Sequence, residues 1–530
     1  MAADNNLAQM GALDINSMES VIQPSGLNII VQADFPEGAK RYKIQKDNSD
    51  NISSPVLSNL GAIDSGDPDN LNTFIKWGFS HYPSQRKMLV IWSHGDSWYK
   101  DGDNKWICPD YSSENLMSIA GGDLNRAFEG IPKLDILLFD ACSMQSIEVI
   151  TQVAEHASYI IASEELVPQY GFPYERIIPI MNGDLDSILN QIPQLYVQSY
   201  LPGEGINPGP GTWTITCSTI ATEALDSFRN AFQEAVQQML LEGTLYHVLR
   251  DDLYEFNTGL ADIDIRQFAT LLHEYRPTWP VFINLLSTWN CIVVASDFTT
   301  YDTGIENIGT AALWYPDNRF NFENGWPQYI KLDFAQNWWI GYVNYVLGDT
   351  EPPPAPVLLS QKVQGKNLIL KIGLQPIPDF FYIEVMLNND GIPRLYSSAR
   401  YASSQEISIP IISSGTYTLK LVDFSGNVSA AISGSYELPS YIQVNPNPIR
   451  GKNIAALRWW LESTEAEKAK LEIYNIRGQK VMDAELGDIS GEGMALLSAK
   501  PGFTKLAAGI YFLRLSVGRT KLTTKMTILY

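Results

Sequence analysis

Two short segments of this chain end in side chains that could act together as a base and a nucleophile. Each is an apolar run that stops at a reactive residue, which is how a buried parallel strand presents chemistry at its carboxyl end. The run Val90 to Ser93 leads into His94, and the run Leu137 to Ala141 leads into Cys142. Because a thiol attacks carbonyl carbons as thiolate, an imidazole within hydrogen-bond reach would activate it. The pair therefore predicts acyl transfer, with Cys142 as nucleophile.

Gly95 adds the third part of such a site. No side chain blocks the approach to its backbone N–H, and with the N–H of Cys142 it could bind the oxyanion of a tetrahedral intermediate. A lone histidine is usually structural, and a free cysteine is usually a core residue. Both residues in matching settings at the ends of strands reverse that expectation. The other histidines and cysteines of the chain lack such a setting.

These segments and their flanks resemble the clostripain family of cysteine peptidases, relatives of caspases and gingipains. The resemblance rests on His94-Gly95 and Asp140-Ala141-Cys142 and covers roughly the first two-thirds of the chain. One departure is Ser97, because the family usually has a glycine before the tryptophan. The resemblance implies an α/β fold, a caspase-like α/β/α sandwich with a mostly parallel sheet. Supporting segments are Ala3 to Leu7, Asn28 to Asp34, Ile63 to Pro68 and Ala162 to Glu165.

Asp140 is the residue that the resemblance places in a pocket for a basic P1 side chain. Residues two apart on a strand face the same way, so Asp140 should lie on the same side as Cys142. There it could pair with Arg or Lys at P1, or it could instead cap the helix that follows. Glu164 and Glu165 are further candidates for the pocket. We therefore expect an endopeptidase that cleaves after Arg or Lys.

The segment between the two motifs predicts a processing site. Family members are often zymogens that cut themselves in this interval, where Lys105 follows the polar turn Asp101 to Asn104. The turn begins like a calcium loop, but Lys105 falls where an oxygen ligand is needed, and no bidentate Glu closes the loop. We therefore expect self-cleavage after Lys105 and neither a metal nor another cofactor. Calcium would enter only through the family resemblance.

The composition limits the partners. Lys and Arg number 37 against 59 Asp and Glu, and a net charge of −22 repels nucleic acid and attracts basic peptides. No segment approaches the ~20 apolar residues of a membrane span. The amino terminus also lacks the apolar core of a signal peptide, so we expect that such a peptide was removed before Met1.

A proline run, Glu351 to Pro356, predicts the main boundary, because neither a helix nor a central strand absorbs it. Residues 1–350 should form the catalytic domain, in which strands alternate with helices. The helices that we expect are Ser146 to Ala157, Ala224 to Leu241 and Asp264 to Tyr275. The expected strands are Asn28 to Asp34, Met88 to Ser93, Asp135 to Ala141, Tyr159 to Ser163, Thr212 to Cys217 and Ile308 to Trp314.

After the prolines, short alternating strands predict two small all-β sandwich domains. Residues 351–438 suggest an immunoglobulin or fibronectin type, with strands at Lys366 to Ile372, Phe380 to Leu387, Gly415 to Val422 and Ala430 to Glu437. Residues 439–530 resemble the C-terminal sorting domain of the type IX secretion system. That resemblance rests on three segments in order, Val444 to Pro448, Leu471 to Val481 and Leu506 to Leu515.

The sorting-domain resemblance implies a location and a partner. The chain would be secreted by, or held on the outer-membrane surface of, a Gram-negative, Bacteroidota-like bacterium, with the type IX machinery as its partner. Two other functions stay open at the level of sequence. One is a non-catalytic surface protein that uses a peptidase scaffold for binding. The other is a transpeptidase or ligase, since an acyl-enzyme can be captured by an amine in place of water.

Overall fold

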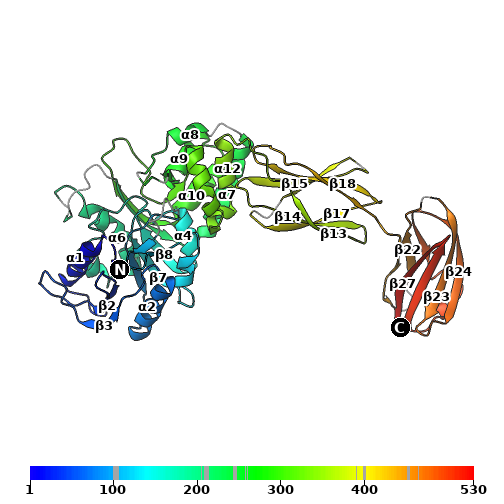
Figure 1. The fold of residues 1–530 in the computed structure, drawn as a ribbon, viewed down its shortest axis with the longest axis horizontal. Coiled ribbons are helices and arrows are strands. Elements are labelled where there is room, and N and C mark those ends of the chain that lie inside the picture. Colours follow the sequence, from blue (N-terminus) through cyan, green and yellow to red (C-terminus); the bar gives the residue numbers. More distant parts are fainter. Residues whose placement is uncertain are drawn as a thin grey trace. The chain divides into compact units, whose positions relative to one another are not determined.

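The computed structural model divides the chain into two compact units, Met1–Glu351 and Pro352–Tyr530 (Figure 1). The residues that it describes are 1–98, 107–203, 206–207, 214–242, 247–256, 258–259, 261–389, 391–397, 401–450, 454–463 and 465–529. The first unit combines helices with sheets, and the second is built from strands. Within these ranges, every helix is too short or too polar to cross a lipid bilayer.

The first unit is organised around one five-stranded sheet. Its strand order is β11-β9-β8-β7-β4. The strands β4, β7 and β8 pair in parallel, and β9 is antiparallel to both β8 and β11. All strands except β9 therefore run in one direction, which confirms the mostly parallel sheet. The bounds are Met88–Trp92 (β4), Leu134–Asp140 (β7), Ala157–Ala162 (β8), Ile215–Ala221 (β9) and Val293–Thr299 (β11).

Helices cover both faces of this sheet. Side chains of Trp92, Ile136 and Leu138 share one core with α1 (Ala8–Glu19), α5 (Tyr174–Ile177) and α6 (Leu185–Ser199). The alternation of a strand sends Leu89, Ile91, Leu137 and Phe139 to the opposite face. Helices on that side and around it are α2 (Pro68–His81), α3 (Asp123–Ala127), α4 (Ile147–Val153), α7 (Leu225–Glu242), α8 (His247–Asp251), α9 (Ile265–Tyr275), α10 (Pro280–Ile292), α11 (Arg319–Tyr329) and α12 (Trp339–Val346). Short 3₁₀ turns of the first unit are η1 (Ile178–Ile180) and η3 (Asp333–Gln336), whereas η4 (Phe503–Lys505) belongs to the second unit.

The crossover helix α4 is shorter than its sequence pattern predicts. We expected a helix from Ser146 to Ala157, but α4 ends at Val153, and β8 begins at Ala157. The apolar residues after Val153 serve the next strand, so periodicity alone overextends the helix. Ser146 caps its amino end, since the Ser146 hydroxyl accepts a hydrogen bond from Val149 N at 3.3 Å. The predictions for α7 and α9 are confirmed to within one residue.

Two of the expected strands lie outside the central sheet. The segment Asn28 to Asp34 contributes only β1 (Ile30–Ala33), in a separate antiparallel sheet with β2 (Ala39–Lys43) and β3 (Val56–Gly61). The segment Ile308 to Trp314 contributes β12 (Ala312–Trp314), which pairs with β10 (Asp262–Asp264). A last small pair joins β5 (Ile107–Asp110) to β6 (Asn115–Met117). Apolar runs indicate strands but do not say which sheet receives them.

The second unit contains two apolar cores, each between two sheets, as expected for two small β-sandwiches. The first sandwich has the sheets β13-β14-β17 and β16-β15-β18-β19, and the second has β20-β22-β25 and β21-β27-β26-β23-β24. The first set of bounds is Val357–Gln364 (β13), Asn367–Gly373 (β14), Phe380–Leu387 (β15), Pro393–Ser397 (β16), Ser404–Pro410 (β17), Gly415–Asp423 (β18) and Ile432–Tyr436 (β19). The second set is Tyr441–Asn445 (β20), Ile449–Arg450 (β21), Ala456–Trp460 (β22), Glu467–Asn475 (β23), Lys480–Ile489 (β24), Glu492–Leu496 (β25), Gly509–Val517 (β26) and Thr520–Leu529 (β27).

Candidate active site

The register between β4 and β7 brings His94 and Cys142 to the same level of the sheet. Trp92 pairs with Asp140, and Ser93 N donates to Asp140 O at 3.2 Å. His94 and Cys142 each follow two residues later, at the carboxyl ends of neighbouring parallel strands. A parallel sheet presents its reactive side chains at this edge. The two residues that the sequence singled out therefore lie at the same edge of the sheet.

Gly95 fits tightly against the loop that carries the thiol. A Cβ atom added at Gly95 would lie 2.8 Å from Cys142 O, 2.9 Å from Ala141 Cβ and 3.0 Å from Met144 Cγ. Such distances to backbone leave no room for a side chain. Glycine is therefore required at this position by packing, whether or not its N–H also binds an oxyanion. The contact shows directly that the His94 loop rests on the Cys142 loop.

Ser97 takes the place of the glycine that the family resemblance led us to expect. Its φ is 55°, in the left-handed region where glycine carries no steric cost. The Ser97 hydroxyl donates to the hydroxyl of Ser146, the cap of α4, at 2.7 Å. This buried hydrogen bond ties the His94 loop to the helix that follows Cys142. The departure from the family pattern thus keeps the geometry that a glycine allows.

Trp98 fixes the far end of the same loop. Its buried ring meets Trp314 and Tyr329 edge to face, with centroids 5.1 and 4.9 Å apart. Both partners are held by Glu148 of α4, whose carboxylate accepts from Trp314 N and from the Tyr329 hydroxyl, each at 3.1 Å. Burial raises the pKa of Glu148 to about 7. The histidine loop is therefore built onto the helix that begins just after the cysteine.

An asparagine from the amino-terminal arm orients the imidazole. Asn6 Oδ1 lies 2.7 Å from His94 Nε2, and the Tyr111 hydroxyl donates to the same oxygen at 3.2 Å. Since Oδ1 is an acceptor, it selects the tautomer with a proton on Nε2 and leaves Nδ1 as the basic nitrogen. Asn5 anchors this arm, because its side-chain amide donates to Ala2 O and Pro109 O, both at 3.0 Å.

The thiol of Cys142 contacts the backbone of Val167. Val167 N donates to Cys142 Sγ at 3.3 Å, and the thiol donates to Val167 O at 3.7 Å. The pKa of Cys142 is raised to about 11, chiefly by burial and also by the charges of Asp96, Asp140 and Glu165, while the hydrogen bond from Val167 N acts in the opposite direction. In this conformation the thiol is neutral at physiological pH.

Asp140 lies beside the thiol but is covered. Its carboxylate accepts from the Tyr174 hydroxyl at 2.8 Å and from Phe172 N at 3.3 Å. Burial raises its pKa to about 6, although both hydrogen bonds act in the opposite direction. Gly171, with φ of 52°, lies so close that an added Cβ would be 2.8 Å from Asp140 Oδ2. The alternative in which Asp140 caps the next helix is wrong, because Ser146 is the cap of α4.

The two glutamates after β8 have different surroundings. Glu164 accepts from Gly309 N at 2.6 Å and shares a hydrogen bond with Asp264, and burial raises its pKa well above the usual range. These partners hold the segment before β12 rather than the thiol. Glu165 contacts the cysteine loop instead, because Ser143 N donates to Glu165 O at 3.1 Å. Of the two, Glu165 is the acidic residue that the structure brings to Cys142, although Glu164 was the one we named first.

Some features of this site escaped the sequence analysis. Asn6 and Val167 carried no motif of their own, although Asn6 lies in the segment Ala3 to Leu7 that supported the resemblance. Lys105, with the turn Asp101 to Asn104, lies outside the described residues, and its cleavage stays a prediction. The oxyanion role of the Gly95 and Cys142 N–H groups also stays a prediction.

A thiol and an imidazole follow adjacent strands of an α/β fold, and the comparison with protein families identifies the class of enzyme. Residues 1–307 match the model of the Clostripain family, and the chain belongs to this family. Residues 443–529 match the model of the secretion system C-terminal sorting domain. The two matches coincide with the catalytic and sorting segments that the sequence motifs indicated.

Individual proteins are similar to parts of this chain. A clostripain of Hathewaya histolytica is 26% identical, over 33% of this chain and 40% of its own length, so the match spans well under half of that relative. An inactive zymogen C11 protease from Parabacteroides distasonis shares the fold, with a TM-score of 0.50, 21% identity and coverage of 63% of this chain and 94% of that one. A secreted C11 cysteine protease from Bacteroides thetaiotaomicron, solved with an irreversible peptide inhibitor, is 26% identical, with a TM-score of 0.47 and coverage of 59% and 87%.

The contact between the two loops predicts a large effect of Gly95→Ala. The added methyl group must displace Cys142 O or the His94 loop, and a shift of about 1 Å in a catalytic group costs roughly a hundredfold in turnover. Gly78→Ala in α2 is the matched control, because no atom lies within 4 Å of its added Cβ. We expect the control to keep full peptidase activity with an unchanged or higher Tm. Equal activity of the two variants, measured on the same peptide substrate, would contradict the contact.

Proposed function

We propose that this chain is a secreted cysteine endopeptidase that cleaves after Arg or Lys through a dyad of Cys142 and His94. The observation that carries the proposal is the register of β4 and β7, which puts the two residues at one edge of the sheet. Membership of the clostripain family supports the reaction class. The match to the clostripain spans only 40% of that protein. The substrates and the specificity are therefore proposed from the residues of this chain.

The proposed reaction proceeds in two halves. His94 Nδ1 takes the thiol proton, and the Cys142 thiolate attacks the carbonyl carbon of the scissile bond. The N–H groups of Gly95 and Cys142 stabilise the oxyanion. His94 then returns its proton to the leaving amine as the C–N bond breaks, which leaves a thioester on Cys142. In the second half, His94 deprotonates water, the hydroxide attacks the thioester, and the thiol leaves with the proton as the acid product departs.

Asn6 assists this cycle through its contact with His94. Its hydrogen bond to Nε2 keeps the ring in one orientation and, in the neutral imidazole, leaves Nδ1 as the basic nitrogen. The amide is neutral, so it stabilises the imidazolium less than a carboxylate would. Asn6 is therefore a positioning residue in the proposed mechanism.

The contact of Cys142 with Val167 supports a resting form that must open before it acts. A buried thiol whose pKa is about 11 gives almost no thiolate at neutral pH. Withdrawal of Val167 N and O from the sulfur would let the thiol turn toward His94. Self-cleavage after Lys105 remains our proposal for the event that triggers this change.

Specificity for basic residues is supported by charge. Asp140 and Glu165 both raise the pKa of Cys142, so both carboxylates lie within electrostatic reach of the thiol. A P1 guanidinium or ammonium group that enters beside them would gain a charge-assisted hydrogen bond. The net charge of −22 also concentrates basic peptides at the surface. We assign the P1 contact to Asp140, and Glu164 is set aside because its partners lie elsewhere.

The dyad is tested by Cys142→Ala and His94→Ala in the full chain, with a library of peptides as substrate. We expect both variants to lose at least about a thousandfold in kcat/KM with unchanged Tm, because groups that act as one unit fail together. A thiol-directed peptide probe ending in Lys should label the parent chain at Cys142. Absence of labelling and cleavage in the activated parent chain would favour a non-catalytic binding protein. Capture of the acyl group by an added amine in preference to water would favour a ligase.

The role of Asp140 predicts a pH dependence. A carboxylate with a pKa of about 6 is neutral below that pH, so kcat/KM for an Arg substrate should rise as the pH increases through 6 and then level off. Asp140→Asn should remove this rising limb of the pH profile and lower kcat/KM by about a hundredfold. Tyr174→Phe is the matched variant, because loss of its hydrogen bond raises the pKa of Asp140 and moves the limb to higher pH. A library profile dominated by acidic or apolar P1 residues would overturn the assignment.

The raised pKa of Asp140 also predicts that the stability of the fold decreases with pH, whereas the activity increases. Because the folded-state pKa of Asp140 is raised from 3.8 to about 6, its stabilising contribution is complete below 3.8 and is lost as the pH rises to 6. Asp140→Asn should therefore flatten the fall in Tm over this interval. Thermal unfolding between pH 3.5 and 7 provides the measurement, independently of any substrate.

We also propose that residues 439–530 are the address for type IX secretion, supported by the match of residues 443–529. The catalytic residues all lie in the unit Met1–Glu351. Removal of residues 439–530 should therefore leave peptide cleavage by the purified protein within about twofold of the parent chain, since the two segments have separate cores. In the native cell the truncated enzyme should accumulate in the periplasm. Truncated enzyme at the cell surface would contradict the address, and loss of activity would show that the segment supports the catalytic unit.

A further inference from the structure

The charge of this chain is distributed unevenly. Residues 439–530 contain 13 Lys and Arg against 8 Asp and Glu, whereas the whole chain contains 37 against 59. The last domain therefore has a net charge of +5, although the net charge of the whole chain is −22. Such a difference in sign between parts of one chain is typical of a protein whose basic part meets an anionic partner.

Part of this positive charge lies on one face of the sheet β21-β27-β26-β23-β24 (Figure 1). Leu513 of β26 belongs to the apolar core of this domain, so its neighbours Phe512 and Arg514 point outward. On the adjacent strand β27, Lys521 and Lys525 are exposed. The outer face of the sheet thus presents cations and an aromatic ring to the solvent.

The register of β26 and β27 gathers these side chains into one patch. Lys525 lies directly opposite Phe512, and Thr523 lies directly opposite Arg514. Directly paired residues share a face of the sheet. Lys521 and Lys525 are separated by about 13 Å along their strand, at about 3.3 Å per residue, and Arg514 lies beside the midpoint between them. We call Phe512, Arg514, Lys521 and Lys525 the basic patch.

The cations on the other side of this face are neutralised. Lys470 of β23 and Lys480 of β24 each lie 3.4 Å from Asp483 Oδ2. Lys480 also lies 3.5 Å from Glu472 Oε1. The opposite charges of this network largely cancel beyond its own contacts. The outer face is therefore polarised, with its net positive charge toward β27.

The basic patch combines unneutralised cations with exposed apolar side chains. Among the residues that the structure describes, no carboxylate lies within ion-pair distance of Lys521 or Lys525. Phe512 and its neighbour on the same face, Ile510, are 42% and 39% exposed. Long cationic side chains beside an exposed ring fit a surface where phosphate groups border hydrocarbon. A soluble polyanion would contact the cations alone.

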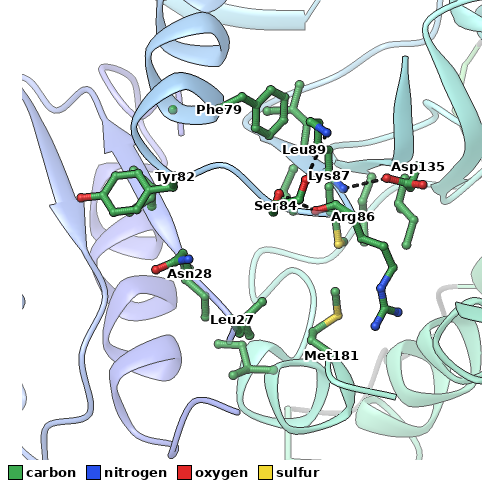
Figure 2. Close-up of a pocket in the computed structure, with 18 of the residues that line it drawn as sticks. Leu27, Asn28, Phe79, Tyr82, Ser84, Arg86, Lys87, Leu89, Asp135 and Met181 are labelled. Carbon is green, nitrogen blue, oxygen red and sulfur yellow. Dashed lines mark hydrogen bonds between the residues drawn. The ribbon is translucent and has the colours of Figure 1, made fainter. Parts of the chain in front are cut away.

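Neighbouring cations also occur in the first unit, at the border of a cavity of about 660 Å³ beside α2 (Figure 2). Arg86 and Lys87 lie there next to Asp135, whose carboxylate accepts from Lys87 N at 2.7 Å. This carboxylate offsets one of the two positive charges. Acidic residues also outnumber basic ones over residues 1–438, so an anionic surface is repelled by this part of the chain.

From this charge pattern we propose that the basic patch binds the last domain to an anionic lipid surface. Phosphate groups of the lipids would lie among Arg514, Lys521 and Lys525, and the ring of Phe512 would enter the boundary between headgroups and hydrocarbon. The inference depends neither on the proposed dyad nor on the proposed secretion address, because binding of the purified full chain to vesicles measures it directly.

The test measures co-sedimentation of the full chain with two kinds of vesicle, phosphatidylcholine alone and phosphatidylcholine with about 30% phosphatidylglycerol. We expect the parent chain to bind the anionic vesicles in spite of its net charge of −22. Each Lys or Arg near an anionic membrane raises the partition constant about fivefold. The double variant Lys521→Gln and Lys525→Gln should therefore weaken binding about twentyfold.

Two matched controls remove the same number of charges elsewhere. The variant Lys470→Gln and Lys480→Gln removes two cations from the same face, and Arg86→Gln with Lys87→Gln removes two at the cavity. Each should weaken binding less than about threefold, because these cations are paired or lie beyond a Debye length from the patch. Equal losses in the test variant and in either control would overturn the proposal.

Phe512→Ala separates a lipid surface from a soluble polyanion. It should weaken binding to the anionic vesicles about fivefold, because part of an aromatic side chain is no longer buried in lipid. Binding to polyglutamate, a soluble polyanion, should not change. Absence of binding of the parent chain to the anionic vesicles would overturn the proposal. If polyglutamate binds in that case, the basic patch is instead assigned to an acidic protein.

Discussion

The pairing of β4 with β7 is the interaction on which the candidate site depends. With Trp92 opposite Asp140, the two chains leave the sheet at the same level, and His94 and Cys142 follow at equal distances. A slip of one residue would turn one side chain to the other face, because side chains alternate along a strand. The register is fixed by burial, since all residues of β7 except Asp135 are buried. The hydrophobic core thus sets the geometry of the chemistry.

The loops beyond the sheet are held by contacts between the two halves of the site. Gly95 rests on Cys142 O, Ser97 bonds to the cap of α4, and Trp98 packs on rings that Glu148 of α4 holds. The loop after His94 therefore contacts three parts of the structure in turn: the Cys142 backbone, the cap of α4 and the rings that Glu148 of α4 holds. This arrangement couples the positions of His94 and Cys142 more closely than two independent loops would. The thiol itself is held by the backbone of Val167, and its pKa of about 11 keeps it neutral at neutral pH.

Much of this could be predicted from the sequence, because apolar runs that end in a reactive residue carry both fold and chemistry. His94, Cys142 and Asp140, the mostly parallel sheet and the all-β second unit follow from such runs and from the family resemblance. The contacts that tune the site could not, because they join distant segments through single atoms: Asn6 to His94 across 88 positions, and Val167 to Cys142 across 25. The helix predicted too long from Ser146 to Ala157 and the strand predicted in the wrong sheet at Asn28 to Asp34 have a related cause. Periodicity is a local signal, whereas helix ends and strand neighbours are decided by tertiary pairing.

The amino-terminal arm connects the edge of the central sheet to the candidate site. Between Met1 and Asn6 it pairs with β1, pairs with β4 and reaches the imidazole, so it passes from the sheet edge to the site within a few residues. Two hydrogen bonds join the arm to β4 and the residue after it. Ala2 N donates to Trp92 O at 3.0 Å, and the Ser93 hydroxyl donates to Ala2 O at 2.8 Å. Any change that loosens the arm within the sheet also loosens Asn6, because Asn5 fixes the turn between them through Ala2 O. Order at the edge of the sheet and the tautomer of His94 are therefore linked.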